Sequence, residues 1–348
     1  MTKQTWTAAV SAILFVVSAA ILAMVRVPYV TYAPGSTTDL LAAVDGQPVV
    51  TVEGLASHPT TGSLRLANVA VTRPDAHLSL PEALLGWWSP DREVYPREAI
   101  YPAGTRAADV RAREAEQMDA AQSAAAAAGL REAGVEVRQM PMVGRVASQG
   151  PSMDLLRPGD FITDVDDAPT PTKEAVEAAI QARAVGEPVT FGVLRDGQAR
   201  TVTVETAASN VQAGVPIVGV TFVTGFSHAP TVRFAVADAA GGAGAGLMMA
   251  LAVFDRVTPD DLLRDRVIAG TGEIDGLGNV REAGGIEEKI SAAQRSGATI
   301  FLLPAANCGD LSGPPALRLV AVSTVDEAVR ALDALADPAT ENLVKGCS

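Results

Sequence analysis

The pattern of apolar and polar positions changes several times along this chain, and the first segment is the most distinct. From Ala8 to Val25 there is no charged residue, and the only polar residues are Ser11 and Ser18. A helix of this length spans roughly 27 Å, close to the thickness of a bilayer's hydrocarbon core. The run predicts either a retained membrane anchor over residues 8–26 or a signal peptide cleaved after Ala20. It is longer than most signal-peptide cores, which favours the anchor.

The residues beside this run indicate how an anchor would be oriented. Trp6 occupies the position of an interfacial aromatic residue, and Arg26 ends the apolar run. The preceding tail, residues 1–7, has Lys3 as its only charged side chain, and a short tail of this kind stays on the inner side. We therefore expect a single-pass protein of the cell membrane whose bulk is extracytoplasmic.

The next region, residues 27–130, contains segments with the pattern of strands and segments with the pattern of helices. Strand patterns cover residues 47–52 and 63–71, and the second alternates polar and apolar positions as a half-buried strand does. A short helix over residues 80–88 ends in a Trp-Trp pair, which we interpret as packing residues. A long Ala-rich helix follows over residues 107–133.

Residues 142–206 show strand patterns around one helix. The expected elements are a strand over 142–146, the stretch LRPGDFITDVDD over 156–167, a helix over 173–184 capped by Thr172, and strands over 189–195 and 200–205. Asp196-Gly197 between the last two strands is typical of a hairpin turn.

The remaining chain alternates strands and helices, which predicts an α/β domain with its own sheet. Strands are expected over 217–223, 231–237, 299–304 and 317–322, and helices over 246–254, 286–297 and 325–336.

The amino-acid composition excludes several classes of function. With 48% hydrophobic and 19% charged residues, the 348-residue chain is globular and long enough for two or three domains. Its formal net charge of −13 argues against a nucleic-acid partner. The three histidines, His58, His77 and His228, are isolated in the sequence, so neither a metal site nor a Ser-His-Asp triad is supported. No cofactor is expected.

Two cysteines, Cys308 and Cys347, lie in the last part of the chain. Outside a membrane, such a pair is consistent with one disulfide that ties the C-terminal tail to the last domain. The alternative is two unrelated thiols.

The phrase RPGDFITDVDDAP and the order of elements around it resemble a bacterial PDZ domain, here placed over residues 131–207. The resemblance implies that an extended chain end binds as an added strand at an open sheet edge. The carboxylate-binding loop is not assigned, because QMPMVG (139–144) is not a typical form of it. The alternative is a PDZ-shaped spacer that binds nothing.

Three motifs resemble the proteolytic domain of the Lon family of Ser/Lys peptidases, placed over residues 208–338 with a tail over 339–348. They are GGAGAG (241–246), GTGEIDGLGNV (270–280) and GGIEEKISAAQRSGA (284–298). In that family the turn reads GPSAG, where serine is the nucleophile and the lysine of GGxxxK is its general base.

Carried over position by position, the resemblance places Lys289 at the general base and Thr271 at the threonine beside it. Backbone N–H groups of Gly242, Ala243 and Ala245 would form the oxyanion turn. The nucleophile position holds Gly244, which has no side chain. Loss of a catalytic serine costs on the order of a millionfold in turnover. Neither Ser227 nor Thr271 lies on the turn that presents a nucleophile.

The whole order of segments resembles the membrane-anchored PDZ-Lon family of Gram-positive bacteria. It implies an α+β multi-domain fold: one transmembrane helix, a β-rich PDZ domain with helices, and a Lon-type α/β proteolytic domain. Members have no ATPase module, and the sequence shows no Walker A motif, so ATP is not implied.

Three functions follow as hypotheses. The first is a membrane-tethered protein that binds polypeptide chains and whose serine endopeptidase activity is impaired. The second is an active ATP-independent Ser/Lys endopeptidase of the cell envelope with an unrecognised nucleophile. The third is a structural envelope protein in which the PDZ unit is a spacer.

Overall fold

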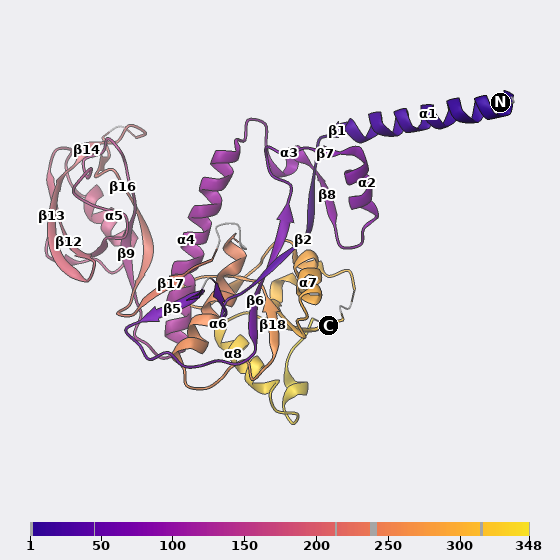
Figure 1. The fold of residues 1–348 in the computed structure, drawn as a ribbon. Coiled ribbons are helices and arrows are strands. Elements are labelled where there is room, and N and C mark those ends of the chain that lie inside the picture. The colour runs from indigo at the N-terminus through magenta and orange to yellow at the C-terminus, as the bar shows by residue number, and fades with distance from the viewer. Residues whose placement is uncertain (1–2, 45, 213, 237–241, 314–315, 348) are drawn as a thin grey trace. The chain divides into compact units, whose positions relative to one another are not determined.

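A computed structural model describes residues 3–44, 46–212, 214–236, 242–313 and 316–347 (Figure 1). The chain divides into two compact units. The discontinuous unit comprises residues 1–133 and 230–348, and the inserted unit comprises residues 134–229. The expected fold class, α+β with several domains, is confirmed.

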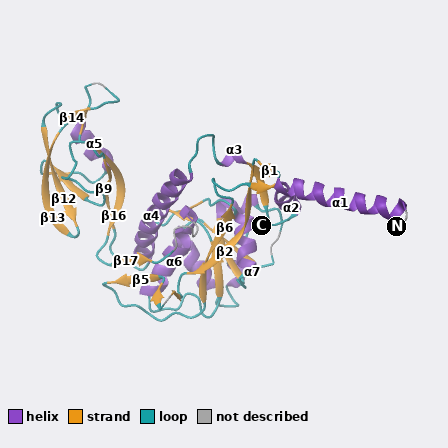
Figure 2. Ribbon diagram, turned by 45° about the horizontal axis from the view of Figure 1, so that its top comes forward, coloured by secondary structure: helices purple, strands orange, loops and turns teal. Residues whose placement is uncertain are grey.

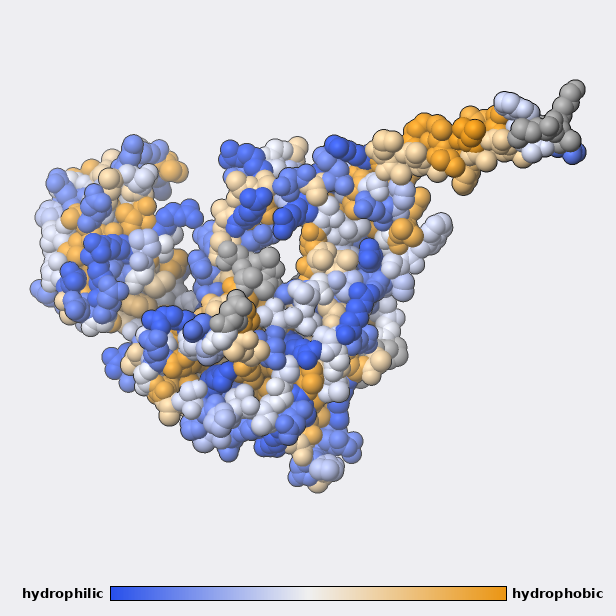
Figure 3. All heavy atoms as spheres, in the orientation of Figure 1, coloured by the Kyte–Doolittle hydropathy of each residue, from blue (hydrophilic) through white to orange (hydrophobic). Residues whose placement is uncertain are grey.

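The discontinuous unit begins with helix α1 (Lys3–Met24). Its stretch Gln4–Met24 is long and apolar enough to cross a membrane, a property that signal sequences share. None of that stretch is buried, and Figure 3 shows the helix as a projecting apolar surface.

A six-stranded sheet forms the centre of this unit. In spatial order its strands are β22 (Arg318–Val322), β21 (Ile300–Pro304), β18 (Val267–Gly270), β6 (Ser63–Val71), β2 (Tyr29–Asp39) and β8 (Glu93–Pro96). The first four are parallel, and the last two pairings are antiparallel.

Strand β6 connects two parts of the chain that we expected to form separate domains. We expected residues 27–130 to precede the proteolytic domain as a separate region, but this region supplies β2, β6 and β8 to the same sheet as β18. The physical reason is burial on both faces of β6, where Leu64, Leu66 and Ala67 are fully buried. A strand that is apolar on both faces needs the interior of a sheet covered on both sides.

Helices cover the two faces of the sheet (Figure 2). Helix α7 (Ile286–Arg295) packs its apolar side on Ala67, Ala269 and Phe301. Because side chains alternate along a strand, Gly270 faces the other side, where a Cβ atom would meet Met248 of α6 (Gly246–Val257) at 2.6 Å. Helix α8 (Val325–Ala334) also contacts α6 and begins at the Thr324 cap.

The Ala-rich helix expected over residues 107–133 is present as α4 (Ala107–Glu132). It packs against α6 through a run of small buried residues, Ala125 to Gly129. A Cβ atom at Gly129 would lie only 2.4 Å from the carbonyl oxygen of Ala250. The composition of α4 therefore reflects a close approach of two helices rather than helix propensity alone.

Helix α2 (Leu80–Trp88) corrects another expectation. We interpreted its two indoles as packing residues, yet the exposed fractions of Trp87 and Trp88 are 65% and 81%. The helix instead packs through Ala83 and Gly86, which are small enough for the neighbouring strand to approach closely.

The remaining elements of this unit are short. They are β1 (Arg26–Val27), β3 (Ala43–Val44), β4 (Gln47–Pro48), β5 (Val50–Glu53), β7 (Leu78–Ser79), α3 (Arg97–Ile100), β17 (Thr231–Phe234), β19 (Glu273–Ile274), β20 (Val280–Arg281), and the 3-10 helices η2 (Ala305–Asp310) and η3 (Glu341–Leu343). The strand expected over 231–237 ends at Phe234, and residue 237 lies outside the described residues.

The inserted unit has a sheet of its own with one helix. The strands in spatial order are β13 (Gln198–Glu205), β12 (Pro188–Arg195), β10 (Phe161–Val165), β9 (Arg138–Val146) and β16 (Val220–Ser227), with β11 (Ala168–Pro169) beside β10. A separate pair joins β14 (Ala207–Ala208) and β15 (Pro216–Ile217), and the helix is α5 (Lys173–Gln181), whose first turn the Thr172 hydroxyl caps.

Strand β16 belongs to the inserted unit, which therefore ends later in the chain than we expected. We placed the boundary at residue 207 and assigned 217–223 to the next domain, but β16 pairs with β9 along its length. The unit therefore extends to residue 229, because β9 needs this partner to satisfy its backbone hydrogen bonds.

Candidate active site

The turn of the GGAGAG motif is the first part of the site. It forms the 3-10 helix η1 (Gly242–Ala245), which leads directly into α6, and residue 241 lies outside the described residues. The carbonyl oxygen of Gly244 accepts hydrogen bonds from the backbone N–H of Gly272 at 2.9 Å and from the Thr271 hydroxyl at 3.0 Å. The turn is thus attached to the loop that follows β18.

Lys289 provides the second part. It lies in the first turn of α7, where its N–H donates to the carbonyl of Gly285 at 3.0 Å. Only 5% of the residue is exposed, and its Nζ donates to Oγ1 of the fully buried Thr271 at 3.0 Å.

Burial determines the charge state of this amine. Loss of hydration lowers the pKa of Lys289 to about 8, although the Glu273 and Glu288 carboxylates act in the opposite direction. A lysine with such a pKa is partly neutral near physiological pH and can accept a proton, as a general base must.

Gly244 completes the arrangement. A Cβ atom on this residue would lie 3.0 Å from Nζ of Lys289, 3.0 Å from Oγ1 of Thr271 and 3.5 Å from Cβ of Ala283. A side chain here would therefore point at the buried amine. The structure brings together the three residues that the motifs singled out, in an arrangement that has a base but no hydroxyl at the nucleophile position.

The proposed oxyanion turn is described in part. Gly242 has a φ of +51°, in the left-handed region that favours glycine, and Ala245 is buried at the start of α6. That the N–H groups of Gly242, Ala243 and Ala245 bind an oxyanion stays a prediction.

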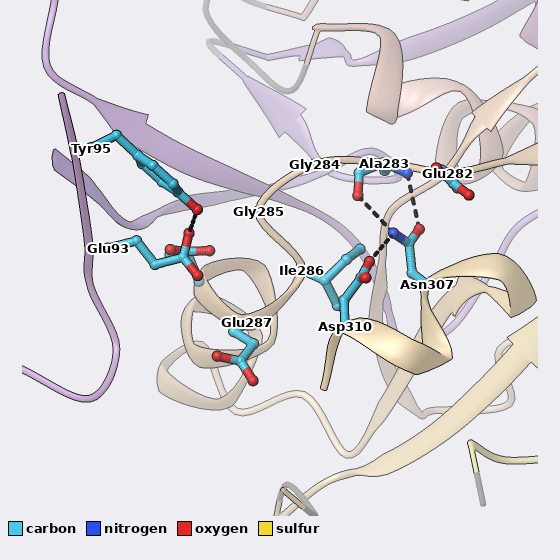
Figure 4. A pocket seen from close by; sticks show the side chains of 11 residues that line it. Glu93, Tyr95, Glu282, Ala283, Gly284, Gly285, Ile286, Glu287, Asn307 and Asp310 are labelled. Carbon is cyan, nitrogen blue, oxygen red and sulfur yellow. Dashed lines mark hydrogen bonds between the residues drawn. The ribbon is translucent and has the colours of Figure 1, made fainter. Parts of the chain in front are cut away.

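Asn307 was missed by the sequence reasoning. It is buried in η2, where its side chain accepts from the N–H of Ala283 at 3.0 Å and donates to the carbonyl of Ala283 at 3.2 Å (Figure 4). Because Ala283 borders the Gly244 position, Asn307 fixes one wall of the site. An asparagine in a PAANC stretch carries no local signal of this role.

A cavity of about 610 Å³ lies next to this wall. Figure 4 shows Glu93, Tyr95 and Glu287 around it, and its lining includes Ala283 but not Gly244, Thr271 or Lys289. The cavity therefore adjoins the site without containing its reactive groups.

Cys308 and Cys347 form a disulfide, with their Cα atoms 5.2 Å apart. The bond joins η2 to the C-terminal tail. Since Cys308 directly follows Asn307, the disulfide holds the short helix that carries the Asn307 contact to Ala283.

The other sequence candidates lie elsewhere. Ser227 ends β16 in the inserted unit, and His228 follows it. Within the described ranges, no group of three or more His, Cys, Asp or Glu side chains is arranged to hold a metal ion.

Comparison with known proteins identifies both domains. Residues 119–206 match the family model described as a PDZ domain, and residues 199–334 match the model of the Lon protease (S16) C-terminal proteolytic domain. The chain therefore contains a PDZ domain and a Lon-type proteolytic domain.

Individual relatives resemble only parts of the chain. The Lon protease of Heliobacterium modesticaldum is 39% identical over 102 residues, which is 28% of this chain and 12% of that protein. The Lon protease of Neorickettsia sennetsu is 46% identical over 67 residues, 18% of this chain and 8% of that protein. The chain thus spans about an eighth or less of the length of these relatives.

Among solved structures, similarity is found to the PDZ domain of an SdrC-like protein from Listeria monocytogenes. The identity is 24%, the TM-score is 0.23, and the match covers 24% of this chain and 87% of the other. A second match is the PDZ domain of an SdrC-like protein from Listeria innocua, at 20% identity and a TM-score of 0.22, over 24% of this chain and 92% of the other.

Proposed function

We propose that this chain, which carries a PDZ domain and a Lon-type S16 proteolytic domain, is a membrane-anchored protein that binds polypeptides outside the cytoplasm and has lost most of its serine endopeptidase activity. The single observation that carries the loss of activity is the Gly244 position. Its missing side chain would point at the Lys289 amine.

The chemistry of the Ser/Lys mechanism explains why this position decides the activity. Peptide-bond attack needs a side-chain oxygen that loses its proton to the neighbouring amine and then forms an ester with the substrate. Lys289 retains the lowered pKa of a base, but glycine supplies no oxygen. Without the nucleophile, turnover falls by on the order of a millionfold.

Polypeptide binding is supported by the inserted unit. PDZ domains bind a chain end by adding it as a strand to a sheet edge, which needs no catalytic group. Such a domain, joined to a catalytically inactive proteolytic domain, would hold or present other polypeptide chains without cleaving them.

The membrane location is supported by α1, whose apolar stretch of 21 residues is followed by the short strand β1 and then by β2 of the central sheet. A retained anchor on a short tail places the two domains on the extracytoplasmic side. We propose no role for ATP, metal ions or nucleic acid.

One observation favours a second function, an active peptidase. The Thr271 hydroxyl lies 3.0 Å from the Lys289 amine and is a candidate nucleophile. Two observations count against this nucleophile. Thr271 is fully buried, so a substrate has no direct access to its hydroxyl, and that hydroxyl already donates its proton to the carbonyl of Gly244.

The test is capture of peptides by the full chain in detergent micelles. The probe is a pool of decapeptides with four randomised C-terminal residues and free carboxylates. We expect a sequence-dependent subset to be retained and, by mass spectrometry, to be recovered uncut. The same pool with amidated C-termini serves as the control and should be retained less. Absence of any retained subset would contradict the binding role, and shortened peptides would contradict the loss of activity.

A further inference from the structure

Four large apolar residues of α2 face outward. Leu84, Leu85, Trp87 and Trp88 have exposed fractions of 39%, 64%, 65% and 81%. The side that packs on the domain consists of Ala83 and Gly86, where a Cβ atom on Gly86 would meet Val94 at 2.8 Å. A surface helix normally buries its large apolar side chains, so this reversed distribution marks an interaction surface.

The place of α2 in the fold indicates what covers this surface. The N–H of Leu80, its first residue, donates to the carbonyl of Val25 at 3.0 Å, one residue beyond the end of α1. Next to this bond, Arg26 and Val27 of β1 pair with Ser79 and Leu78 of β7. Figure 1 shows α2 beside the end of α1 that enters the domain. The backbone thus holds α2 at the end of the apolar helix.

The side chains suit the boundary of a bilayer. Tryptophan is enriched at the level of lipid headgroups, because its ring is apolar and its N–H can remain hydrated. Trp87 also lies near the ring of Tyr29, with the ring centroids 6.0 Å apart. Helix α2 is already formed, since the Ser79–Glu82 capping box closes its first turn, so insertion would require no folding.

We propose that α2 docks on the bilayer that α1 spans, with Leu85, Trp87 and Trp88 inserted between the headgroups. This rests on the proposed membrane anchor. The discontinuous unit would then have two contacts with the membrane, and α2 would restrict its rotation about α1.

The chain's three tryptophans allow a test with the full protein in vesicles of phosphatidylcholine and phosphatidylglycerol. Trp6→Phe leaves the α2 pair as the only indoles, and Trp87→Phe with Trp88→Phe leaves Trp6. Lipids that carry a nitroxide near the headgroup quench tryptophan only at short range. We expect the α2 pair to lose emission to a degree comparable with Trp6, to shift its emission to shorter wavelength, and to be protected from acrylamide.

The outcomes separate the two proposals. If Trp6 is quenched while the α2 pair keeps its emission and remains open to acrylamide, the anchor stands and the docking of α2 is wrong. If neither reporter is quenched, the chain is not held in the bilayer, and both proposals are wrong. Quenching of both supports the docking.

Discussion

Replacing Gly244 with serine is expected to raise the peptidase activity of this chain about a hundredfold or more above its own background. A catalytic serine accounts for a factor on the order of a million in turnover, so the expected gain is a small part of what the residue can supply. The structure supports this because the Cβ position of residue 244 lies 3.0 Å from Nζ of Lys289. The same position lies 3.0 Å from Oγ1 of Thr271. Both contacts are slightly tight, so the end of the Lys289 side chain and the Thr271 hydroxyl must each shift by a few tenths of an ångström to accommodate the new group. The added hydroxyl would then be within hydrogen-bonding reach of an amine whose pKa is lowered to about 8.

The measurement is cleavage of fluorescently labelled, unfolded casein by the full chain in detergent. Gly244→Ala is the matched control, because it adds the same Cβ atom without a hydroxyl and should leave the background unchanged. Combining Gly244→Ser with Lys289→Met should remove the gained activity. A Gly244→Ser variant that folds normally but cleaves no faster than Gly244→Ala would show that the turn no longer presents a nucleophile.

The second large effect concerns stability. Lys289→Met is expected to increase the free energy of unfolding at pH 7 by about 2–3 kcal/mol, since burial of a charged amine is costly. Lysine has a pKa of about 10.5 in the unfolded chain and about 8 in the folded one, so the unfolded state binds more protons between these values. The contribution of Lys289 to the stability of the native chain is therefore least favourable below pH 8 and improves as the pH rises from 8 to 10.5. Each pKa unit corresponds to about 1.4 kcal/mol, and loss of the hydrogen bond to Thr271 offsets about 1 kcal/mol of the gain.

Denaturant unfolding at pH 7 and at pH 10.5 checks this prediction. At the higher pH the amine is neutral in the folded chain and about half protonated in the unfolded chain, so most of the advantage of Lys289→Met should disappear. Lys345→Met, at an exposed position in the tail, is the control and should change neither value. An equal loss of stability at both pH values for Lys289→Met would mean that the amine carries no desolvation cost and is not a tuned base.

Much of the local structure could be predicted because its signals are local. The Thr172 cap of α5 and the Asp196-Gly197 hairpin turn depend on side chains within a few residues of each other. The turn residues adopt φ values of +52° and +74°, which Asp and Gly tolerate and most other residues do not. Signals of this kind can be recognised in a single sequence.

The composition of the central sheet could not be predicted in the same way. Leu64 of β6 pairs with Ile268 of β18, about two hundred positions away, across the whole inserted unit. No local pattern at residues 63–71 specifies that partner. The exposure of Trp87 and Trp88 was missed for a related reason. An aromatic pair at a helix end can pack inside the protein or bind a partner outside it, and the sequence does not distinguish the two.

The site was found through family motifs rather than from residue patterns. The motifs placed Lys289, Thr271 and Gly244 at matching positions, and the structure shows that these residues are in contact. Asn307 and Glu273 were not found, because their influence on Ala283 and Lys289 acts across the fold. Only coordinates could reveal those interactions.

Loss of the nucleophile is tested most directly by the intact mass of the native chain after exposure to a fluorophosphonate, which bonds to activated serine or threonine hydroxyls. We expect an unchanged mass for the native chain and one added group for Gly244→Ser. A stoichiometric adduct on the native chain at Thr271 or any other hydroxyl, lost in Lys289→Met, would contradict this expectation.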